Sequence, residues 1–295
     1  MTYIVTTEYE LDKVAAPNLP LAPPEWNRQY QDQFANVLRL YFNRLDALLA
    51  KLNTSNNTFP DGSTLRFPYG AFFQDGVTTL SANITNNSTT PISVGSTAGF
   101  PSSGYFLIGS EIISYTTKTA TTFDGTITRG VLGTTNVAHT AGAAISEVQG
   151  TGSSTTIGTV LFNNTSFSNG VAASSDFSKI EFSTAGIYNL QFSAQLLNFT
   201  TSEDNVTMWF TKNGADIDNS ASIEQVNSKH GTSPGATIMT VNIFEQFAAG
   251  DYVTLNWASD TGNTVVGTYP AGTSPVHPVS PAIIFTASFV SAPPG

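Results

Sequence analysis

Tyr188-Asn189-Leu190-Gln191-Phe192-Ser193-Ala194-Gln195-Leu196 is the stretch that decides the fold of this chain. Apolar and polar residues alternate through all of it, which is the period of a strand with one buried face and one solvated face. A helix would instead repeat its apolar residues every three or four positions. The stretch therefore predicts a long strand at the centre of a β-domain.

The residues that follow repeat the same signals. Val206–Phe210 leads into Lys212-Asn213-Gly214, where Asn-Gly supplies the positive φ angles of a two-residue hairpin. Two further runs, 240–247 and 252–257, are separated by Ala249-Gly250-Asp251. Several strands at hairpin spacing favour a β-sandwich, and among sandwiches a jelly roll, over residues 151–295.

The last predicted strand, residues 282–290, is apolar on both faces at its start, in Ala282-Ile283-Ile284-Phe285. A strand in a two-layer sandwich meets the core on one face only. The other face must be covered by something else. A neighbouring subunit and a loop of the same chain both fit, and the sequence leaves the two open.

Residues 61–150 form a second zone, in which short apolar runs are separated by Gly, Pro, Ser and Asp. The runs are 79–84, 91–94, 104–108, 111–116 and 122–129. Asp124-Gly125 is a suitable tight turn. This pattern predicts a small antiparallel β-domain.

Residues 1–60 begin with an extended, proline-punctuated arm and continue as a predicted helix over 25–53. Pro24 and Glu25 are a start signal, because proline at the first turn lacks an N–H that would be unpaired there. Apolar residues then recur at spacings of 4, 3, 4, 3 and 4, which is the seam of a coiled coil. The seam residues are Phe34, Leu38, Tyr41, Leu45, Leu48 and Leu52.

This helix needs a partner. Full burial of one such side chain contributes roughly 1.5–3 kcal/mol, so a free helix with all of them in water would be unfavourable. A helix lying on its own chain's β-domain would satisfy the same residues. A self-associating bundle is the leading interpretation, since Val37, Leu40, Phe42 and Leu49 widen the apolar face beyond that of a two-stranded zipper.

The composition of the chain argues against several classes of function. The net charge is −10 and the pI is near 4.5, which argues against nucleic-acid binding because phosphate contacts need clustered Lys and Arg. The chain has no cysteine, so disulfides, thiol catalysis and cysteine metal sites are excluded. No run of 18 apolar residues and no signal peptide is present, so we expect no membrane insertion.

The residues that could carry catalysis are the histidines and the close acidic pairs. These are His139, His230, His277, Glu203-Asp204 and Asp216 with Asp218. His139 fits a turn or packing residue, His230 lies in an expected exposed loop, and His277 lacks a neighbouring Asp or Ser pattern. The acidic pairs fit solvated turns better than the two carboxylates of a glycan-cleaving enzyme. The sequence predicts no catalytic residue, no cofactor and no metal ligand.

A ligand surface, if present, is expected on two long segments, 219–235 and 262–278, which are predicted as loops. Long loops are often functional. Tyr269 and His277 are the candidate surface-binding residues. Trp209, Trp257 and Tyr269 could stack on a sugar ring, although packing in the core is the commoner fate of aromatic side chains.

The C-terminal zone also carries an ordered set of motifs. They are Phe182–Tyr188, Lys212-Asn213-Gly214, Ala249–Leu255 and the closing apolar strand. The set resembles the trimeric jelly rolls of the tumour necrosis factor family and the complement globular heads. The resemblance implies assembly around a threefold axis, with ligands on the outer surface. Complement-type heads often hold calcium, but no carboxylate cluster here matches such a site.

The other two zones resemble parts of phage proteins. Ile92–Val94, Gly99-Phe100-Pro101, Gly109–Thr116 and Thr128–Thr134, with His139 and Gly142, resemble a small module recurrent in phage tail proteins. Residues 18–20 and 31–46, above all 37–43, resemble the N-terminus of structural proteins from marine phages. These resemblances imply a place on a virion and carry no catalytic role.

We therefore expect a mainly β chain of three domains. Residues 1–60 form an arm and a long α-helix for trimerisation and attachment to other virion proteins, 61–150 a spacer, and 151–295 a jelly roll. The expected function is a non-enzymatic homotrimeric tail fibre or spike on the phage particle surface, which binds the host surface, with a cell-surface glycan as a partner. The alternatives are a capsid decoration or head-fibre protein, a free lectin-like trimer and, from another class, a polysaccharide depolymerase.

Overall fold

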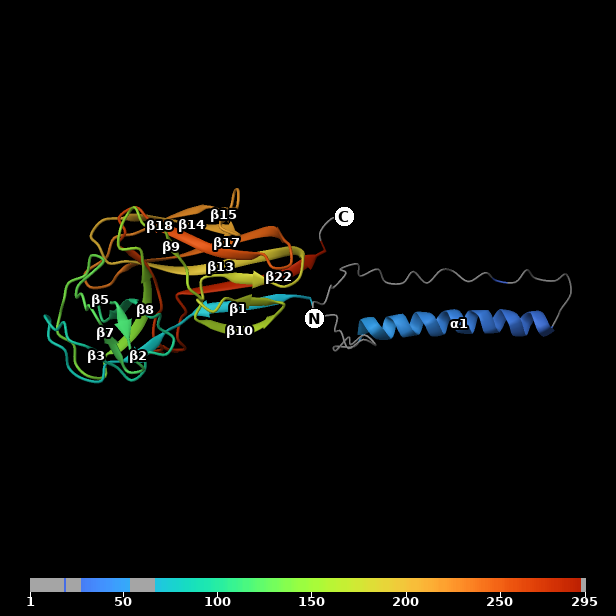
Figure 1. The fold of residues 1–295 in the computed structure, drawn as a ribbon, viewed down its shortest axis with the longest axis horizontal. Helices are drawn as coiled ribbons and strands as arrows, with labels where there is room; N and C mark the ends of the chain where they lie inside the picture. The colour runs from blue at the N-terminus through green and yellow to red at the C-terminus, as the bar shows by residue number, and fades with distance from the viewer. Residues whose placement is uncertain (1–18, 20–27, 54–66, 293–295) are drawn as a thin grey trace. The chain divides into compact units, whose positions relative to one another are not determined.

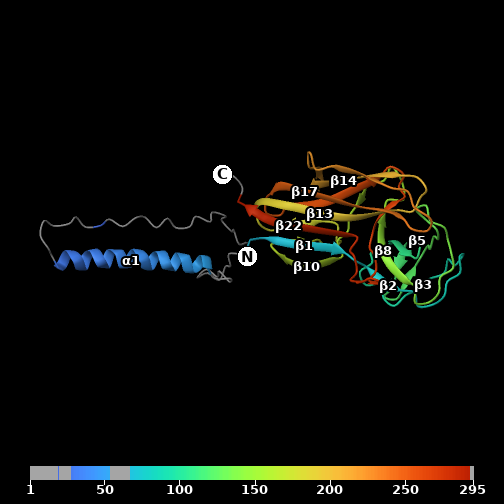
Figure 2. The same cartoon turned by 180° about the vertical axis from the view of Figure 1, so that it is seen from behind.

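The computed structural model describes Leu19, residues 28–53 and residues 67–292. The chain divides into two compact units, residues 1–67 and 68–295. The described chain is mainly β, with one helix and antiparallel sheets, as the sequence predicts. Figure 1 labels these elements and Figure 2 shows them from behind.

The helix and strands have the following bounds: α1 Arg28–Asn53, β1 Tyr69–Gln74, β2 Val77–Thr79, β3 Ile92–Ser93, β4 Gly104–Ile108, β5 Glu111–Tyr115, β6 Thr117–Lys118, β7 Thr122–Asp124, β8 Ala144–Gly150, β9 Gly158–Thr159, β10 Asn164–Asn169 and β11 Val171–Ala173. They continue with β12 Ile180–Phe182, β13 Gly186–Asn198, β14 Asp204–Lys212, β15 Ala215–Asp216, β16 Ser222–Val226, β17 Gly235–Phe247, β18 Tyr252–Ser259, β19 Thr264–Gly267, β20 Gly272–Thr273, β21 Val276–His277 and β22 Ile283–Ser291.

The first unit contains α1, Arg28–Asn53, and the polar cluster after it, which is predicted to end the helix, lies outside the described residues. The expected start at Pro24 and Glu25 and the extended arm lie outside the described residues. Tyr30 and Phe34, one turn apart, stack with ring centroids 6.0 Å from each other. Whether α1 joins a bundle stays a prediction.

β13, which contains the alternating stretch, is the central strand of one sheet of a sandwich. It pairs along its whole length with β17, from Gly186 opposite Phe247 to Asn198 opposite Gly235. Its other edge pairs with β22, which pairs with β1, which pairs with β10. The strand order of this β13 sheet is thus β17-β13-β22-β1-β10, with every pairing antiparallel.

The second sheet of the sandwich, the β14 sheet, has the order β11-β12-β18-β14-β16, with β9 beside β18 and β15 beside β14. The β14–β15 hairpin turns at Asn213 and Gly214, whose φ angles are 52° and 84°. The Asn-Gly hairpin predicted from the sequence is confirmed. In both views β14 and β18 lie in one layer, and β22, β1 and β10 in the other.

The main core lies between these two sheets and is built from the alternation that the sequence shows. Tyr188, Leu190, Phe192, Ala194 and Leu196 of β13 all point inward and are fully buried. The facing sheet contributes buried apolar residues from β14 and β18, among them Val206, Met208, Phe210, Val253, Leu255 and Trp257. The Phe192 and Phe210 rings meet edge to face across the layers, 5.5 Å apart.

β1 comes from the zone that the sequence assigns to the middle domain, and it was not among the predicted strands. It lies in the β13 sheet between β22 and β10. Phe72 points into the sandwich core and is fully buried. Residues 77–150 are therefore inserted between the first strand of the sandwich and the rest of it.

The inserted residues, the middle module, have a core of their own. The predicted runs at 104–108 and 111–116 are confirmed as the antiparallel hairpin of β4 and β5. A three-stranded sheet, β3-β7-β6, covers it. Phe106 and Phe123 stack with centroids 4.5 Å apart, and Tyr115 lies 4.6 Å from Phe123.

The middle module is joined to the sandwich by a continuous sheet. β8 pairs with β4 on one edge and with β19 on the other, and β19 pairs with the end of β13. A small apolar cluster fills the junction, with Leu107, Ile112, Val148, Leu197 and Val265 among its members. The predicted domain boundary at residue 150 stays a prediction, but strands from both sides of it share one sheet.

The two segments predicted as loops contain strands. Residues 219–235 include β16, which pairs with β14, and residues 262–278 include β19, β20 and β21. These strands are short or polar. β16 and β19 are held by main-chain pairing to strands elsewhere in the sequence, whereas β20 and β21 pair with each other as a local hairpin, and no local apolar pattern records either kind of pairing.

Candidate self-association surface

The outer face of the β13 sheet carries large apolar side chains on four strands. Successive side chains of a strand point to opposite faces, so the register places these residues on the side away from the core. This apolar outer face consists of Ile238 and Phe244 of β17, Ile284 of β22, Tyr69 of β1 and Phe167 of β10. Each of the five is between 39% and 61% exposed.

Register and ring contacts connect these residues across the sheet. Ile284 lies opposite Phe73 of β1, and Tyr69 contacts Phe167 edge to face at 5.8 Å. β13 itself contributes a polar stripe between β17 and β22, in which the side-chain oxygen of Asn189 accepts a hydrogen bond of 3.0 Å from Asn242 Nδ2. The face is therefore apolar on both sides of a narrow polar centre.

The outer face of the β14 sheet is polar. Its outward positions include Asn205, Thr207, Trp209, Thr254 and Asn256. The indole N–H of Trp209 donates to Asp216 Oδ1 at 2.8 Å, so this half-buried ring is fixed against its own sheet. Ile223 is a large aliphatic side chain here, and it is 70% exposed.

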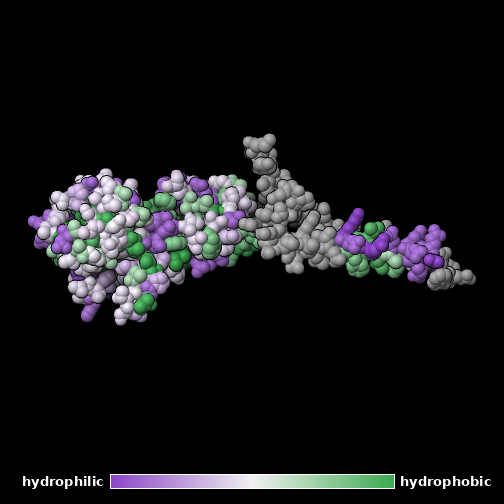
Figure 3. All heavy atoms as spheres, turned by 90° about the horizontal axis from the view of Figure 1, so that it is seen from below, coloured by the Kyte–Doolittle hydropathy of each residue, from purple (hydrophilic) through white to green (hydrophobic). Residues whose placement is uncertain are grey.

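The apolar outer face presents five large apolar side chains to water, on both sides of the polar stripe of β13. Exposed apolar patches often mark interaction sites. Burial of a half-exposed Ile or Phe would contribute about 1 kcal/mol. Figure 3, viewed from the side of β1 and β10, shows hydrophobic residues gathered in patches on a mostly polar surface of this unit.

The structure describes the side chains of four of the six predicted seam residues. Phe34, Leu38, Tyr41 and Leu45 are half-buried on α1, whereas Leu40 and Phe42, off the seam, are exposed. Leu48 and Leu52 belong to α1, but their side chains lie outside the described residues.

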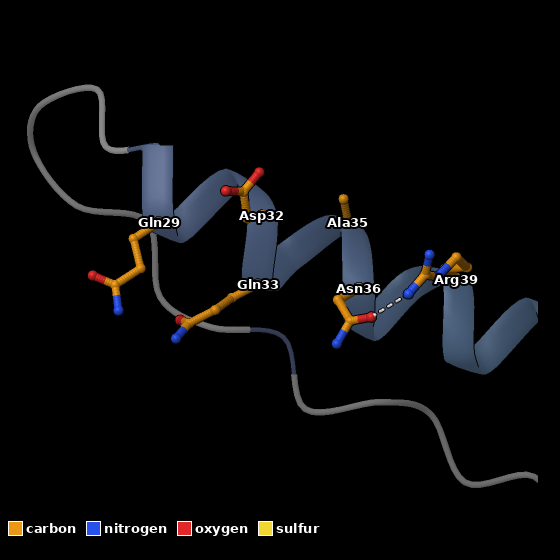
Figure 4. Close-up of a pocket in the computed structure, with 6 residues that line it drawn as sticks. All are labelled: Gln29, Asp32, Gln33, Ala35, Asn36 and Arg39. Carbon is orange, nitrogen blue, oxygen red and sulfur yellow. Dashed lines mark hydrogen bonds between the residues drawn. The ribbon is translucent and has the colours of Figure 1, made fainter.

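A shallow hollow runs along α1 and is shown in Figure 4. It is lined by Gln29, Asp32, Gln33, Ala35, Asn36 and Arg39. All six side chains are exposed and belong to this single helix, and Arg39 donates a hydrogen bond of 2.9 Å to Asn36. The hollow is an open groove with no buried polar group, and it does not qualify as a site.

The two candidate surface-binding residues have different surroundings. Tyr269 is half-buried against the junction cluster, pairs with Ser280, and has its pKa raised by burial. His277 is exposed on the β20–β21 hairpin, with Nδ1 2.8 Å from the Pro278 carbonyl oxygen. Of the two, His277 is the one with an exposed side chain.

Trp257, a candidate for stacking on a sugar, is buried in the sandwich core.

His139 belongs to a buried ion cluster that the sequence did not reveal. Glu111 is fully buried and accepts two hydrogen bonds from Arg129, at 2.7 and 2.8 Å. It also accepts the Gly130 and Val137 N–H groups, and His139 Nε2 lies 2.8 Å away. Despite burial, these donors keep the pKa of Glu111 below its ordinary value. The cluster ties together loops of the middle module, as the packing interpretation of His139 predicts.

The solvated-turn prediction for the acidic pairs is wrong for Asp204, which is buried at the start of β14. Asp204 accepts hydrogen bonds from the hydroxyls of Ser259, Thr261 and Thr264, at 2.5 to 2.9 Å, so its pKa is lowered although burial opposes this. Asp216 is exposed beside Trp209. Across residues 28–53 and 67–292, no group of three or more His, Asp or Glu side chains is arranged to hold a metal ion.

No helix within the described ranges is long and apolar enough to cross a membrane. No protein-family model matches the sequence, and comparison with curated proteins finds no significant match.

Proposed function

We propose that this chain is a non-enzymatic structural protein of a phage particle that works as a homotrimer. The observation that carries the proposal is the apolar outer face of the β13 sheet, beside a polar outer face on the other sheet. An apolar sheet face of this kind is suited to burial against a second copy of the same chain.

The strand order supports a jelly roll. Successive strands from β12 to β14 cross between the sheets, and β16 to β18 cross again before β22 closes the β13 sheet. Two facing antiparallel sheets connected in this way form a double-sheet jelly roll. This agrees with the resemblance of residues 182–290 to the trimeric jelly rolls of the tumour necrosis factor family and the complement heads.

The number of subunits rests on that resemblance together with the seam on α1. A helix with Phe34, Leu38, Tyr41 and Leu45 along one side can pair with its copies from the other subunits. Two separate surfaces, one on the helix and one on the sandwich, would then hold the trimer.

The place on a virion rests on the phage resemblance of residues 18–46 and 92–142. We propose a tail fibre or spike that attaches through residues 1–60 to other virion proteins and displays the jelly roll to the host surface, where a glycan is a partner. A capsid decoration protein would use the same trimer at another place on the particle. A free lectin-like trimer would use it away from the particle.

Native mass measurement of the full chain tests the assembly. We expect three times the chain mass of 31.2 kDa. A monomer with α1 intact would contradict the trimer. Removal of residues 1–60 should abolish incorporation into particles while residues 68–295 stay folded.

The location is tested by labelling the C-terminal unit on intact particles. Label on tail projections supports the fibre or spike. Label spread over the head would favour decoration, and label absent from particles would favour the free lectin-like trimer. Release of oligosaccharides from host polysaccharide would overturn the non-enzyme proposal.

A further inference from the structure

Two segments connect the sandwich with the middle module, and one buried carboxyl group lies between them. The chain leaves the sandwich at the end of β1 and returns after β8. Glu147 of β8 donates its N–H to the Gly76 carbonyl, 2.7 Å away, and its own carbonyl accepts the Thr268 N–H at 3.2 Å. Its side chain accepts a hydrogen bond of 3.1 Å from Asn163 Nδ2, on the returning segment. Glu147 thus contacts both connecting segments.

The Glu147 carboxyl group is buried with few donors around it. The residue is 1% exposed. Gly76 packs so closely that a Cβ atom there would lie 2.8 Å from Glu147 Oε2. The Gln74 amide is near enough to favour the ionised form slightly, yet neither Gln74 Nε2 nor Oε1, both buried, has a hydrogen-bond partner in ordinary geometry.

The charged groups around Glu147 offset its burial only in part. Lys118 of β6 favours the ionised form, but its ammonium donates to the carbonyls of Thr97 and Phe100, at 2.7 and 2.5 Å. Asp75 of the β1–β2 turn adds a negative charge, and Tyr115 of β5 contributes a neutral phenol that donates to Pro101. Burial dominates and raises the pKa of Glu147 from 4.5 to about 8.

We propose that Glu147 is a proton-operated latch between the middle module and the sandwich. As a neutral acid it fits the closed junction with the Asn163 amide. As a carboxylate it would be a buried charge that Lys118 stabilises only in part, which is costly unless water reaches it. Opening of the two connecting segments admits that water, so ionisation loosens the junction locally. The latch does not depend on the proposed virion role.

The direction of the pH dependence follows from the raised pKa. The junction is most stable below pH 4.5, where the carboxyl group is neutral in both the folded and the unfolded chain. This stability is lost as the pH rises through about 8, because only the unfolded or opened chain ionises freely. An ordinary paired carboxylate has the opposite dependence.

Hydrogen exchange of the full chain, read by mass spectrometry and corrected for the intrinsic rate, tests the latch. We expect peptides covering 74–79 and 158–164 to lose at least about tenfold in protection between roughly two pH units below and two above the pKa. Glu147→Gln, which is neutral at every pH, should keep that protection. Glu181→Gln, at an exposed position of β12, should behave like the wild-type chain.

Infrared spectroscopy of the wild-type chain provides a second measurement that does not require the variant to fold. A protonated carboxylic acid band should be present at neutral pH and disappear as the pH rises through about 8, where the loss of protection levels off. The absence of that band at neutral pH would overturn the latch, and so would junction protection that changes equally in the wild-type and Glu147→Gln chains.

Discussion

The two outer faces of the sandwich are built from long antiparallel strands of the same kind, yet they carry different side chains. The β13 sheet presents Phe244 and Ile238 to the outside, whereas the β14 sheet presents Thr207, Trp209 and Asn256. Both faces satisfy their main-chain hydrogen bonds within the sheet. The difference therefore lies in what each face is suited to meet: the first a protein surface, the second water.

The comparison also shows that exposure by itself does not identify an interface. Ile223 is more exposed than any member of the apolar outer face, but the residues opposite and beside it on β14 are polar. A single aliphatic side chain on a polar face is ordinary, while five on one face are not. Ile223 is therefore a natural matched control for Phe244.

The largest effect is expected from Phe244→Glu. A carboxylate placed in the proposed contact between subunits would be unpaired, which costs several kcal/mol in each subunit of the proposed trimer. We expect the trimer to dissociate into folded monomers in light scattering after size-exclusion chromatography. Ile223→Glu should leave the mass unchanged. Equal dissociation by both variants would remove the distinction between the two faces.

Phe285→Ala should destabilise the core that lies between the two sheets. Phe285 is adjacent to Ile284 on β22 but points into the core, where it contacts Phe72 and Phe162. Loss of a buried Phe side chain costs about 3–5 kcal/mol of unfolding free energy. Denaturant titration followed by intrinsic fluorescence measures it. Below the denaturation midpoint the assembly should persist, since no outer residue changes.

Ile284→Ala should weaken association by a smaller amount. It removes part of a half-exposed side chain, so we expect association to weaken by about 1 kcal/mol per subunit, with little change in unfolding of the isolated subunit. Sedimentation equilibrium over a range of concentrations would detect the shift. An unchanged association constant would place Ile284 outside the proposed subunit interface. The other four residues of the apolar outer face would then have to account for association.

Trp209→Phe should have the smallest effect and is confined to the polar face. It removes the indole hydrogen bond to Asp216, which contributes about 0.5–1.5 kcal/mol to folding. We expect a modest decrease in the thermal unfolding midpoint and no change in mass. Dissociation by this variant would mean that the β14 sheet also takes part in assembly.

Apolar and alternating runs recovered the long strands β13, β14, β17, β18 and β22 and the β4–β5 hairpin, but not several of the other strands. β8 was missed because its buried positions include Ser146, Glu147 and Gln149, which do not look like core in a sequence. β1 was missed because Tyr69–Gln74 is apolar on both faces.

The self-association surface was anticipated at one point only. The double apolar start of β22 indicated that its outer face needs a cover, and Ile284 lies on that face. Phe244 and Phe167 gave no such signal. Phe244 lies in a predicted strand whose faces were not assigned, and Phe167 lies in a polar strand that was not predicted.

The amino-acid sequence by itself determined that this chain builds β-structure around alternating strands, with low charge and few candidates for chemistry. Alternation indicates that a strand has one buried and one solvated face, because side-chain direction is a local property of the backbone. Which strands become neighbours is decided by main-chain hydrogen bonds between distant residues. Only the tertiary structure could therefore place Tyr69, Phe167, Ile284 and Phe244 on one surface, and bury Glu147 between two connecting segments.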